Sequence, residues 1–340
     1  MKFVTFEVST PIGKVQHIGV LQGQNVIDLH EAYASYLRED RAVFRWRDLA
    51  NGILPTDMLK FIEGGEMAMD AACLAIEKFE KMGSPAMQRG GVKQAYRLEE
   101  IKLLAPLPRP VSIRDCSAFP EHNMNMRELS RLNRELPSIW YEIPAHYRAS
   151  CTTVIGPDEP ILWPSYTEQL DYELEVAVCI GKWGVNIPED RAAEYIFGYT
   201  IYNDISARDI QGKEMTLMLG PGKGKSFENS NIMGPCLVTP DEIEPENMRM
   251  IARINGEIWS EGNTKDMHFN FAQLIAHLSK DDPMYPGEFI GSGTAGFGSG
   301  KENNRWIKPG DIVELEVEGI GVLRNKVERI QEAQGSGHNI

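Results

Sequence analysis

Hydrophobic and polar residues alternate along several short segments of the chain, and this alternation is typical of β-strands. Near the N-terminus it predicts strands over residues 3–8, 15–21 and 26–28, followed by helical segments between about 31 and 80. Further along it predicts strands over 161–163, 172–181, 197–203, 236–239, 248–254 and 311–317. One amphipathic helix is expected where Phe271, Leu274, Ile275 and Leu278 recur at helical spacing. Because strands and helices do not alternate regularly, we expect an α+β, predominantly β fold and no doubly wound parallel sheet.

The 340-residue chain is longer than one average domain, and a proline-rich segment offers a boundary. Residues 105–110 read APLPRP, and three prolines in six residues disfavour both helix and central strand. We therefore expect a smaller N-terminal α+β domain over 1–104, this linker, a larger domain over 111–330 and a frayed tail over 331–340.

The chain carries 35 basic and 49 acidic residues, which gives a net charge of −14. This acidic balance argues against nucleic acid and anionic membranes as partners, although local cations can still bind a small anionic substrate. No apolar run approaches the length of a membrane span, and the first residues alternate instead of forming an apolar signal segment. The five cysteines are scattered without a CxxC pair, which argues against a disulfide framework and a zinc ribbon. We expect a cytoplasmic protein.

Two glycine-rich segments imitate nucleotide-binding motifs. Residues 291–296, GSGTAG, match G-x-G-x-x-G, but the glycines, asparagines and proline that follow leave no room for the helix that this motif requires. Residues 224–226, GKS, imitate the end of a phosphate-binding loop, but leucine occupies position 219, where the first glycine of that loop belongs. We expect neither segment to bind a nucleotide.

Two glutamates lie two positions apart in the segment DYELEVAVCIG, so on a strand Glu173 and Glu175 point to the same side. That side continues with Ala177 and Cys179, while the opposite side is apolar. The strand therefore enters a core, where a bare pair of carboxylates is costly and a bound cation would stabilise it. The same spacing at residues 314–318 keeps a polar side and indicates a solvated face. A solvated face is also the alternative for the first pair.

Two aspartates extend this set of oxygen ligands. Asp204 follows the apolar strand expected over 197–203, and Asp115 follows an extended segment over 111–113. Each residue type is by itself also common at turns and caps. Carboxylates without histidine or cysteine suit Mg²⁺, or Mn²⁺ or Ca²⁺, better than zinc.

Three further residues are candidates for chemistry. His122 follows Asp115 by seven residues, and histidine is the side chain best suited to accept a proton near neutral pH. Lys225, in GPGKGKSF, can present an ammonium group to a substrate oxygen, and Glu302 lies in a glycine-rich segment. Read singly, these residues would be an ordinary loop histidine, an exposed lysine and a solvated glutamate.

Five segments resemble the fumarylacetoacetate hydrolase superfamily in this order: RDCSAFPEHN, LDYELEVAVCIGK, YNDISARDIQ, GKGKSF and IGSGT…KPGDIVELEVEGIGVLRN. The resemblance runs from about residue 105 to 328, while residues 1–104 match only loosely. It implies a C-terminal mixed β-sandwich roll, usually part of a homodimer, with a divalent metal at its centre.

The resemblance also implies roles for individual residues. The metal ligands would be Glu173, Glu175, Asp204 and, as in the full-length fumarylacetoacetases, Asp115. His122 would be the general base, Glu302 the acid that orients it, and Lys225 the group that stabilises an oxyanion. Substrate contacts are expected from Arg131, Tyr147, Arg208, Gln211 and Thr294.

The substrate implied by the resemblance is an anionic 1,3-diketo acid, such as an acylpyruvate or fumarylpyruvate from the catabolism of aromatic compounds or sugar acids. Ser117 and Met215 stand where the fumarylacetoacetases have tyrosines, so fumarylacetoacetate itself is not expected. The expected reaction is metal-dependent hydrolysis of a carbon–carbon bond, because the His122–Glu302 pair provides the base that attack by water needs. The first alternative is a metal-dependent decarboxylase, isomerase or dehydratase of a keto acid. The second is a non-catalytic, metal-stabilised binding protein.

Overall fold

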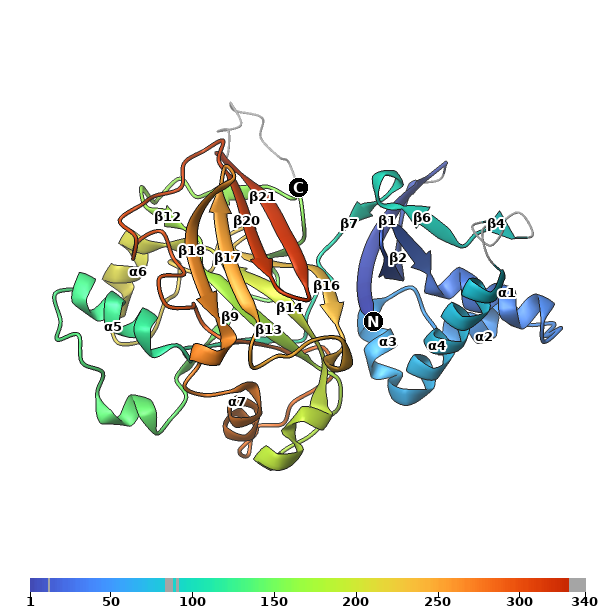
Figure 1. Cartoon of the computed structure of the whole chain (residues 1–340), viewed down its shortest axis with the longest axis horizontal. Helices are drawn as coiled ribbons and strands as arrows, with labels where there is room; N and C mark the ends of the chain where they lie inside the picture. Colours follow the sequence, from blue (N-terminus) through green and yellow to red (C-terminus); the bar gives the residue numbers. More distant parts are fainter. Residues whose placement is uncertain (12, 83–87, 90–91, 330–340) are drawn as a thin grey trace, which may run out of the picture.

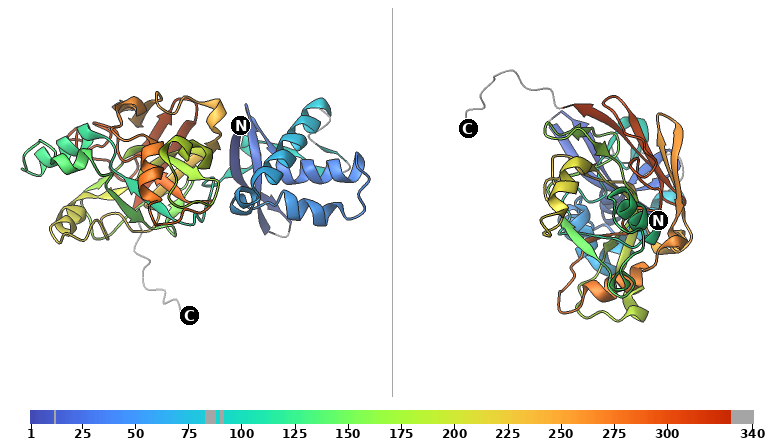
Figure 2. Two further views of the ribbon diagram at one scale, coloured as in Figure 1. Left: turned by 90° about the horizontal axis from the view of Figure 1, so that it is seen from below. Right: turned by 90° about the vertical axis from the view of Figure 1, so that its left-hand side faces the viewer.

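The computed structural model describes residues 1–11, 13–82, 88–89 and 92–329. The chain forms two lobes, a smaller one built from the N-terminal residues and a larger one from the rest (Figure 1). A view turned by 90° shows the same two lobes lying side by side (Figure 2). The tail expected over 331–340 lies outside the described residues.

The smaller lobe packs helices against short strands. Its helices are α1 (Leu29–Glu39), α2 (Trp46–Ile53), α3 (Met58–Glu63), α4 (Gly65–Met82) and the 3₁₀ helix η2 (Leu98–Glu100). Its strands are β1 (Lys2–Thr10), β2 (Gly13–Gln22), β3 (Asn25–Asp28), β4 (Gln88–Arg89), β5 (Val92–Lys93), β6 (Ala95–Arg97) and β7 (Lys102–Leu103). Asp28 ends β3 and caps α1, because its carboxylate accepts the backbone N–H of Glu31 at 3.0 Å. The early strands and the helical stretch predicted from the sequence are confirmed.

The larger lobe is mostly strand. Its strands are β8 (Ile113–Cys116), β9 (His146–Ala149), β10 (Val154–Ile155), β11 (Ile161–Trp163), β12 (Leu170–Asp171), β13 (Leu174–Ile180), β14 (Ile196–Asp204), β15 (Ser206–Ala207), β16 (Asn231–Val238), β17 (Arg249–Ile254), β18 (Glu257–Asn263), β19 (Phe289–Gly291), β20 (Ile312–Val317) and β21 (Gly321–Arg329). Its helices are α5 (Pro120–Leu129), α6 (Arg208–Met215) and α7 (Phe271–Leu278), with 3₁₀ helices η3 (Ser138–Tyr141), η4 (Glu189–Tyr195), η5 (Pro240–Glu242) and η6 (Thr264–Asp266). The amphipathic helix predicted over 271–278 is confirmed.

One large sheet runs through both lobes. Within the described residues its order is β6-β3-β2-β1-β16-β14-β13-β19-β8-β9, with β7 beside β1 and β10 beside β16. β1 joins the lobes by pairing with β16, where Lys2 lies opposite Val238 and Phe3 opposite Leu237. The division at residues 105–110 stays a prediction, and two side chains of that segment, Ala105 and Leu107, are buried.

A second sheet, in the order β11-β21-β20-β17-β18, packs against the centre of the first one. Leu174, Val176 and Val178 of β13 share one hydrophobic core with Leu315 and Val317 of β20. The opposite face of β13 belongs to a different core, formed with the helices of the smaller lobe. Both faces of β13 are therefore buried, as its sequence predicts, and the predicted α+β, predominantly β sandwich is confirmed.

A helix that the sequence analysis did not predict carries His122. The residue lies in the first turn of α5, so the alternative of an ordinary loop histidine does not describe its position. Pro120 lies at the start of this helix, where its fixed φ is favourable and its missing N–H costs no hydrogen bond. The segment lacks a strong amphipathic pattern because His122 and Asn125, which are polar, are its buried residues.

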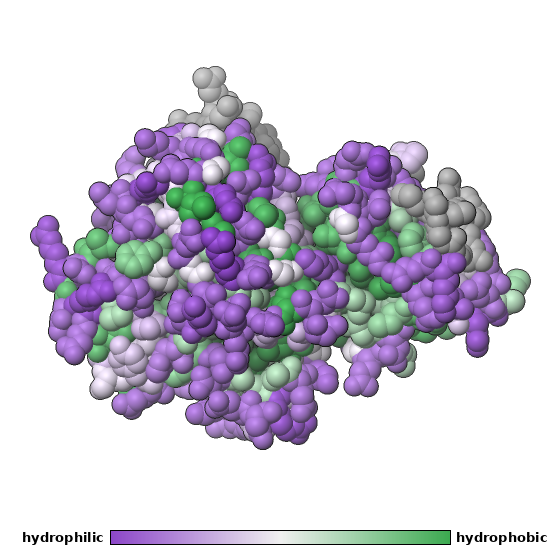
Figure 3. Space-filling view, in the orientation of Figure 1, coloured by the Kyte–Doolittle hydropathy of each residue, from purple (hydrophilic) through white to green (hydrophobic). Residues whose placement is uncertain are grey.

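The face of the molecule seen in Figure 3 is mostly hydrophilic, with apolar residues in small separate patches. Within the described residues, no helix combines the length and apolar character needed to cross a membrane.

Candidate functional site

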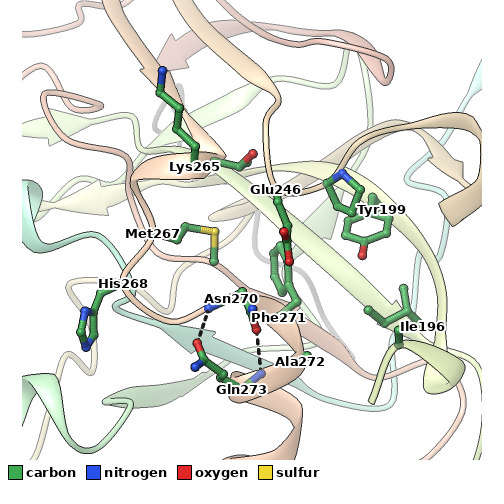
Figure 4. A pocket seen from close by; sticks show the side chains of 13 residues that line it. Ile196, Tyr199, Glu246, Lys265, Met267, His268, Asn270, Phe271, Ala272 and Gln273 are labelled. Atoms are coloured by element: carbon green, nitrogen blue, oxygen red, sulfur yellow. Dashed lines mark hydrogen bonds between the residues drawn. The ribbon is translucent and has the colours of Figure 1, made fainter. Parts of the chain in front are cut away.

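Two hollows in the larger lobe are candidates for a site. The larger one, of about 1070 Å³, lies between α5, β9, α6 and the segment before Lys301, and it contains most of the predicted site residues. The smaller one, of about 360 Å³, lies beside α7 and η6 (Figure 4). There the side chains of Asn270 and Gln273 each accept a hydrogen bond from the backbone N–H of the other residue. None of the predicted catalytic or metal-binding residues lines this smaller hollow. The larger hollow, called the cleft below, is therefore the candidate site.

Three buried carboxylates from different strands meet at the floor of the cleft. They belong to Asp115 of β8, Glu175 of β13 and Asp204 of β14, and one oxygen of each lies within 4.8 Å of the others. Each has a buried oxygen without a hydrogen-bond partner among the described residues, namely Asp115 Oδ1, Glu175 Oε2 and Asp204 Oδ1. Oxygens of this kind are costly to bury bare.

The sheet explains why these residues meet. Glu175 lies opposite Tyr202, two residues before Asp204, in the β13–β14 register, and Asp115 lies opposite Gly291 in the β8–β19 register. A Cβ atom at Gly291 would be 2.3 Å from Asp115 Oδ1, so only glycine leaves space for that carboxylate. The glycine-rich segment that imitates a nucleotide motif thus makes room for an acidic side chain.

The negative charges of these three carboxylates are not fully neutralised by positive groups of the protein. Burial raises the pKa of Asp115 and Glu175 well above their ordinary values, and the neighbouring carboxylates raise them further. Burial also raises the pKa of Asp204, although the ammonium group of Lys225 opposes this. The cluster therefore lacks positive charge.

Glu173, the fourth predicted ligand, has a different environment. One of its oxygens pairs with Arg208 Nη1 at 2.8 Å and the other with Lys225 Nζ, which also lies 2.5 Å from Asp204 Oδ2. Burial opposes ionisation of Glu173, but the charges of Arg208 and Lys225 outweigh it and lower its pKa. Lys225 is buried, so the exposed-lysine reading does not hold. Glu173 is thus neutralised by cations of the chain itself.

His122 projects from α5 toward this cluster. Its Nδ1 lies 2.8 Å from Glu302 Oε2, and its Nε2 lies 3.9 Å from Glu173 Oε1. Because an ionised carboxylate only accepts hydrogen bonds, Glu302 holds the neutral ring with its proton on Nδ1 and leaves Nε2 as a base. Burial opposes ionisation of Glu302, but its interaction with His122 and its hydrogen bonds from Asn125 and Ser299 outweigh burial, so the pKa of Glu302 is lowered.

Four of the predicted substrate contacts line the cleft or touch the carboxylates. Tyr147 donates its hydroxyl to Asp204 Oδ2 at 2.6 Å, and Thr294 donates to Glu175 Oε1 at 3.1 Å. Arg208 and Gln211 line the cleft and bond to each other at 3.1 Å. Arg131 is exposed and does not line the cleft, whereas Arg127, one helical turn earlier on α5, does.

Several residues that line the cleft or support it carry no motif that would have revealed them. Asn125 donates to Glu302 Oε1 at 3.0 Å, and Asp171 accepts hydrogen bonds from Arg208 and from two backbone N–H groups. Lys301 lines the cleft next to Glu302. Helical spacing would have singled out Asn125, three positions after His122 and on the same side of α5, had that helix been recognised.

Comparison with known proteins identifies the family of the chain. Residues 112–328 match the family model described as fumarylacetoacetate (FAA) hydrolase C-terminal. An oxaloacetate tautomerase of Bacillus subtilis is 35% identical over 237 residues, which cover 68% of this chain and 75% of the relative. A mitochondrial oxaloacetate tautomerase of Homo sapiens is 32% identical over 280 residues, 81% of this chain and 80% of the relative.

Solved structures share the whole fold. A fumarylacetoacetate hydrolase of Exiguobacterium antarcticum aligns with a TM-score of 0.71 at 24% identity, covering 97% of this chain and 100% of that one. The maleylpyruvate hydrolase of a Sphingobium strain aligns with a TM-score of 0.69 at 19% identity, with the same coverage. The family model covers most of the chain, and two relatives exceed 30% identity. We conclude that this protein belongs to the fumarylacetoacetate hydrolase family.

Proposed function

We propose that the protein is a divalent-metal-dependent enzyme that moves a proton between carbon and oxygen of an α-keto acid, a keto–enol tautomerisation. The observation that carries this proposal is the set of buried, unpartnered carboxylate oxygens of Asp115, Glu175 and Asp204 beside the available Nε2 of His122. An acidic cluster prepared for a cation and a base prepared for a proton together meet the needs of enol formation.

The donor set fits a hard divalent cation such as Mg²⁺. Asp115, Glu175 and Asp204 would hold it, because their free oxygens converge from three strands. When bound, such an ion polarises the carbonyl oxygen of a keto acid and lowers the cost of placing negative charge there. Glu173 is the less available ligand, because both of its oxygens already pair with cations of the chain, Arg208 and Lys225.

The chain's own residues carry the proton and the charge. His122 Nε2 accepts a proton from the carbon next to the carbonyl, while Glu302 fixes the tautomer of the ring and stabilises its protonated form. The protonated Nε2 then gives this proton to the enolate oxygen, which completes the enol and restores the neutral ring. Lys225 is buried beside Asp204 and Glu173, so its ammonium group is placed to offset negative charge on a substrate oxygen.

We favour tautomerisation over hydrolysis, whereas the sequence analysis favoured hydrolysis and gave isomerisation only as an alternative. The two relatives described above that exceed 30% identity are named oxaloacetate tautomerases. The hydrolases among the solved structures are below 25% identity and support only the fold.

Hydrolysis of a 1,3-diketo acid is the second candidate, and one observation favours it. The His122–Glu302 pair, at 2.8 Å, has the geometry of a base that activates water. Both reactions use the same imidazole, so the nature of the substrate separates them.

The test is an assay of the purified full chain with Mg²⁺ and, in parallel, with a chelator. We expect the protein to accelerate loss of the ultraviolet absorbance of enol oxaloacetate above the spontaneous rate, and only with the metal. A small panel of acylpyruvates, followed by loss of the diketone absorbance, measures hydrolysis. Turnover of acylpyruvates without effect on oxaloacetate would replace the first candidate by the second, and metal binding without either reaction would contradict both.

Asn125 gives a prediction about positioning. Its amide donates to Glu302 and accepts from Arg134 Nη1 at 2.6 Å, so it fixes the carboxylate that fixes His122. Asn125→Ala should lower kcat about tenfold with little change in KM, because one buried hydrogen bond to a charged group is lost. Asn125→Asp should be more harmful, since it sets a second carboxylate against Glu302.

Steady-state kinetics of both Asn125 variants check this order, with thermal unfolding as a control for the fold. Equal kcat in Asn125→Ala, Asn125→Asp and the unmodified protein would contradict the positioning role. The identity of the ion as Mg²⁺, the homodimer and the cytoplasmic location stay predictions.

A further inference from the structure

Lys301 and Arg208 are held on one wall of the cleft by a single carboxylate. Asp171 Oδ2 accepts from Arg208 Nε at 2.8 Å and from the backbone N–H of Lys301 at 3.2 Å. Asp171 Oδ1 accepts from the backbone N–H of Gly300 at 2.9 Å. Asp171 is fully buried, so this anchor fixes both segments relative to each other.

Each cation has donor capacity left over. Arg208 uses Nε on Asp171 and Nη1 on Glu173 and Gln211, but its Nη2 is buried without a partner in the described part of the chain. The Lys301 ammonium is half-buried, lines the same cleft, and forms no ion pair or hydrogen bond with any described residue. Two cations on one wall that each keep an unused donor form a binding place for a further anion.

The charge balance agrees with the geometry. Burial lowers the pKa of Lys301 and the positive charge of Arg208 lowers it further, while the charges of Asp171 and Glu173 oppose this shift without cancelling it. A bound anion would relieve both effects. A lysine without a binding partner can extend its ammonium group into solvent at little cost in free energy. Lys301 instead remains half-buried near the positive charge of Arg208, although the protein has a net charge of −14.

This pair is separate from the carboxylate cluster. Arg208 contacts Glu173, Glu173 contacts Lys225, and Lys225 contacts Asp204, so an acidic and a basic side chain lie in sequence between Arg208 and the proposed metal ligands. A keto acid whose carbonyl end lies at the cluster would present its other end to Lys301 and Arg208.

We propose that Lys301, with the free Nη2 of Arg208, binds a second carboxylate of the substrate, so that Lys301 selects dicarboxylic over monocarboxylic keto acids. This inference rests on the proposed function for the position of the keto end. It assigns a specificity-determining role to a residue that no motif marked.

The experiment measures dissociation constants by calorimetry on the full chain with Mg²⁺. The probes are oxaloacetate against 2-oxobutanoate and 2-oxoglutarate against 2-oxopentanoate, pairs of equal length that differ in a terminal carboxylate or methyl group. The unmodified protein should bind the dicarboxylic member of at least one pair at least about tenfold more tightly, as expected for a charge-assisted contact. Lys301→Met should lose that preference without weakening the monocarboxylic acid, and Lys301→Arg should restore most of it.

Lys308→Met is the matched control, because it removes one exposed lysine charge outside the cleft. Loss of the dicarboxylate preference in Lys301→Met but not in Lys308→Met supports the subsite. Because binding is measured independently of turnover, this result holds even if the proposed reaction is not observed. Turnover of a keto acid together with an unchanged preference in Lys301→Met would overturn the subsite and leave the proposed function standing. Equal weakening of both members of a pair would also overturn it, because Lys301 would then bind the shared carboxylate.

Discussion

Replacing Glu175 with glutamine is expected to weaken Mg²⁺ binding at least about a hundredfold, because a neutral amide takes the place of one of three converging anions. The substitution keeps the shape of the side chain and an oxygen for the hydroxyl of Thr294. Calorimetry with Mg²⁺ and Mn²⁺ measures the loss directly.

Without metal, Glu175→Gln is expected to stabilise the fold. Asp115, Glu175 and Asp204 repel one another when buried together, so Glu175→Gln should unfold at a higher temperature than the unmodified protein in a chelator. Saturating Mg²⁺ should reverse this order, because only the unmodified protein gains stability from binding.

Glu316→Gln is the matched control for this substitution. Glu316 has a glutamate two positions before it, as Glu175 does, but it lies on β20 with its side chain partly exposed and paired with Arg253. It should leave Mg²⁺ affinity unchanged. Unaltered metal affinity in Glu175→Gln would rule out the three-carboxylate site. Glu173→Gln should cost less affinity than Glu175→Gln, since cations of the chain already neutralise Glu173.

Removing the imidazole of His122 is expected to lower kcat by roughly 10²–10⁴-fold, the usual contribution of a general base. His122→Gln should leave Mg²⁺ affinity close to that of the unmodified protein, because His122 is not among the converging ligands. Rates measured with oxaloacetate and with the acylpyruvate panel, beside calorimetry, separate the two effects. Glu302→Gln should have a smaller effect in the same direction, since it weakens the orientation of the ring without removing the base.

Two other histidines serve as controls for His122. His277 lies on α7 away from the cleft, and His277→Gln should retain full activity. His146 lines the cleft and is the competing candidate for a base. Loss of turnover in His146→Gln, with activity kept in His122→Gln, would transfer the role of base to His146 and refute the pairing with Glu302.

Local pattern was enough to predict the strand that carries the first two acidic residues. Leu174, Val176 and Val178 alternate with Glu175 and Ala177, and a strand with period two must place these sets on opposite faces. The structure confirms burial on both faces, and the partly exposed Glu314 and Glu316 confirm the contrast drawn from the second glutamate pair.

Local pattern failed where a helix is short and its buried side is polar. α5 hides His122 and Asn125 in place of apolar residues, so hydrophobic periodicity gave no signal for it. The same helix brings Arg127 to the cleft and leaves Arg131 beyond its end, so the substrate contact expected from Arg131 stays a prediction.

The sequence by itself determined the types of chemistry available, the order of the main strands and the two-faced burial of β13, because these follow from residue identity and from a period set by the backbone. Only the tertiary structure decided which charges neutralise each other. Asp115, Glu175 and Asp204 converge with free oxygens, while Glu173 is taken up by Arg208 and Lys225. Ion pairing depends on distances of a few ångströms between residues far apart in the chain, and register between strands sets those distances.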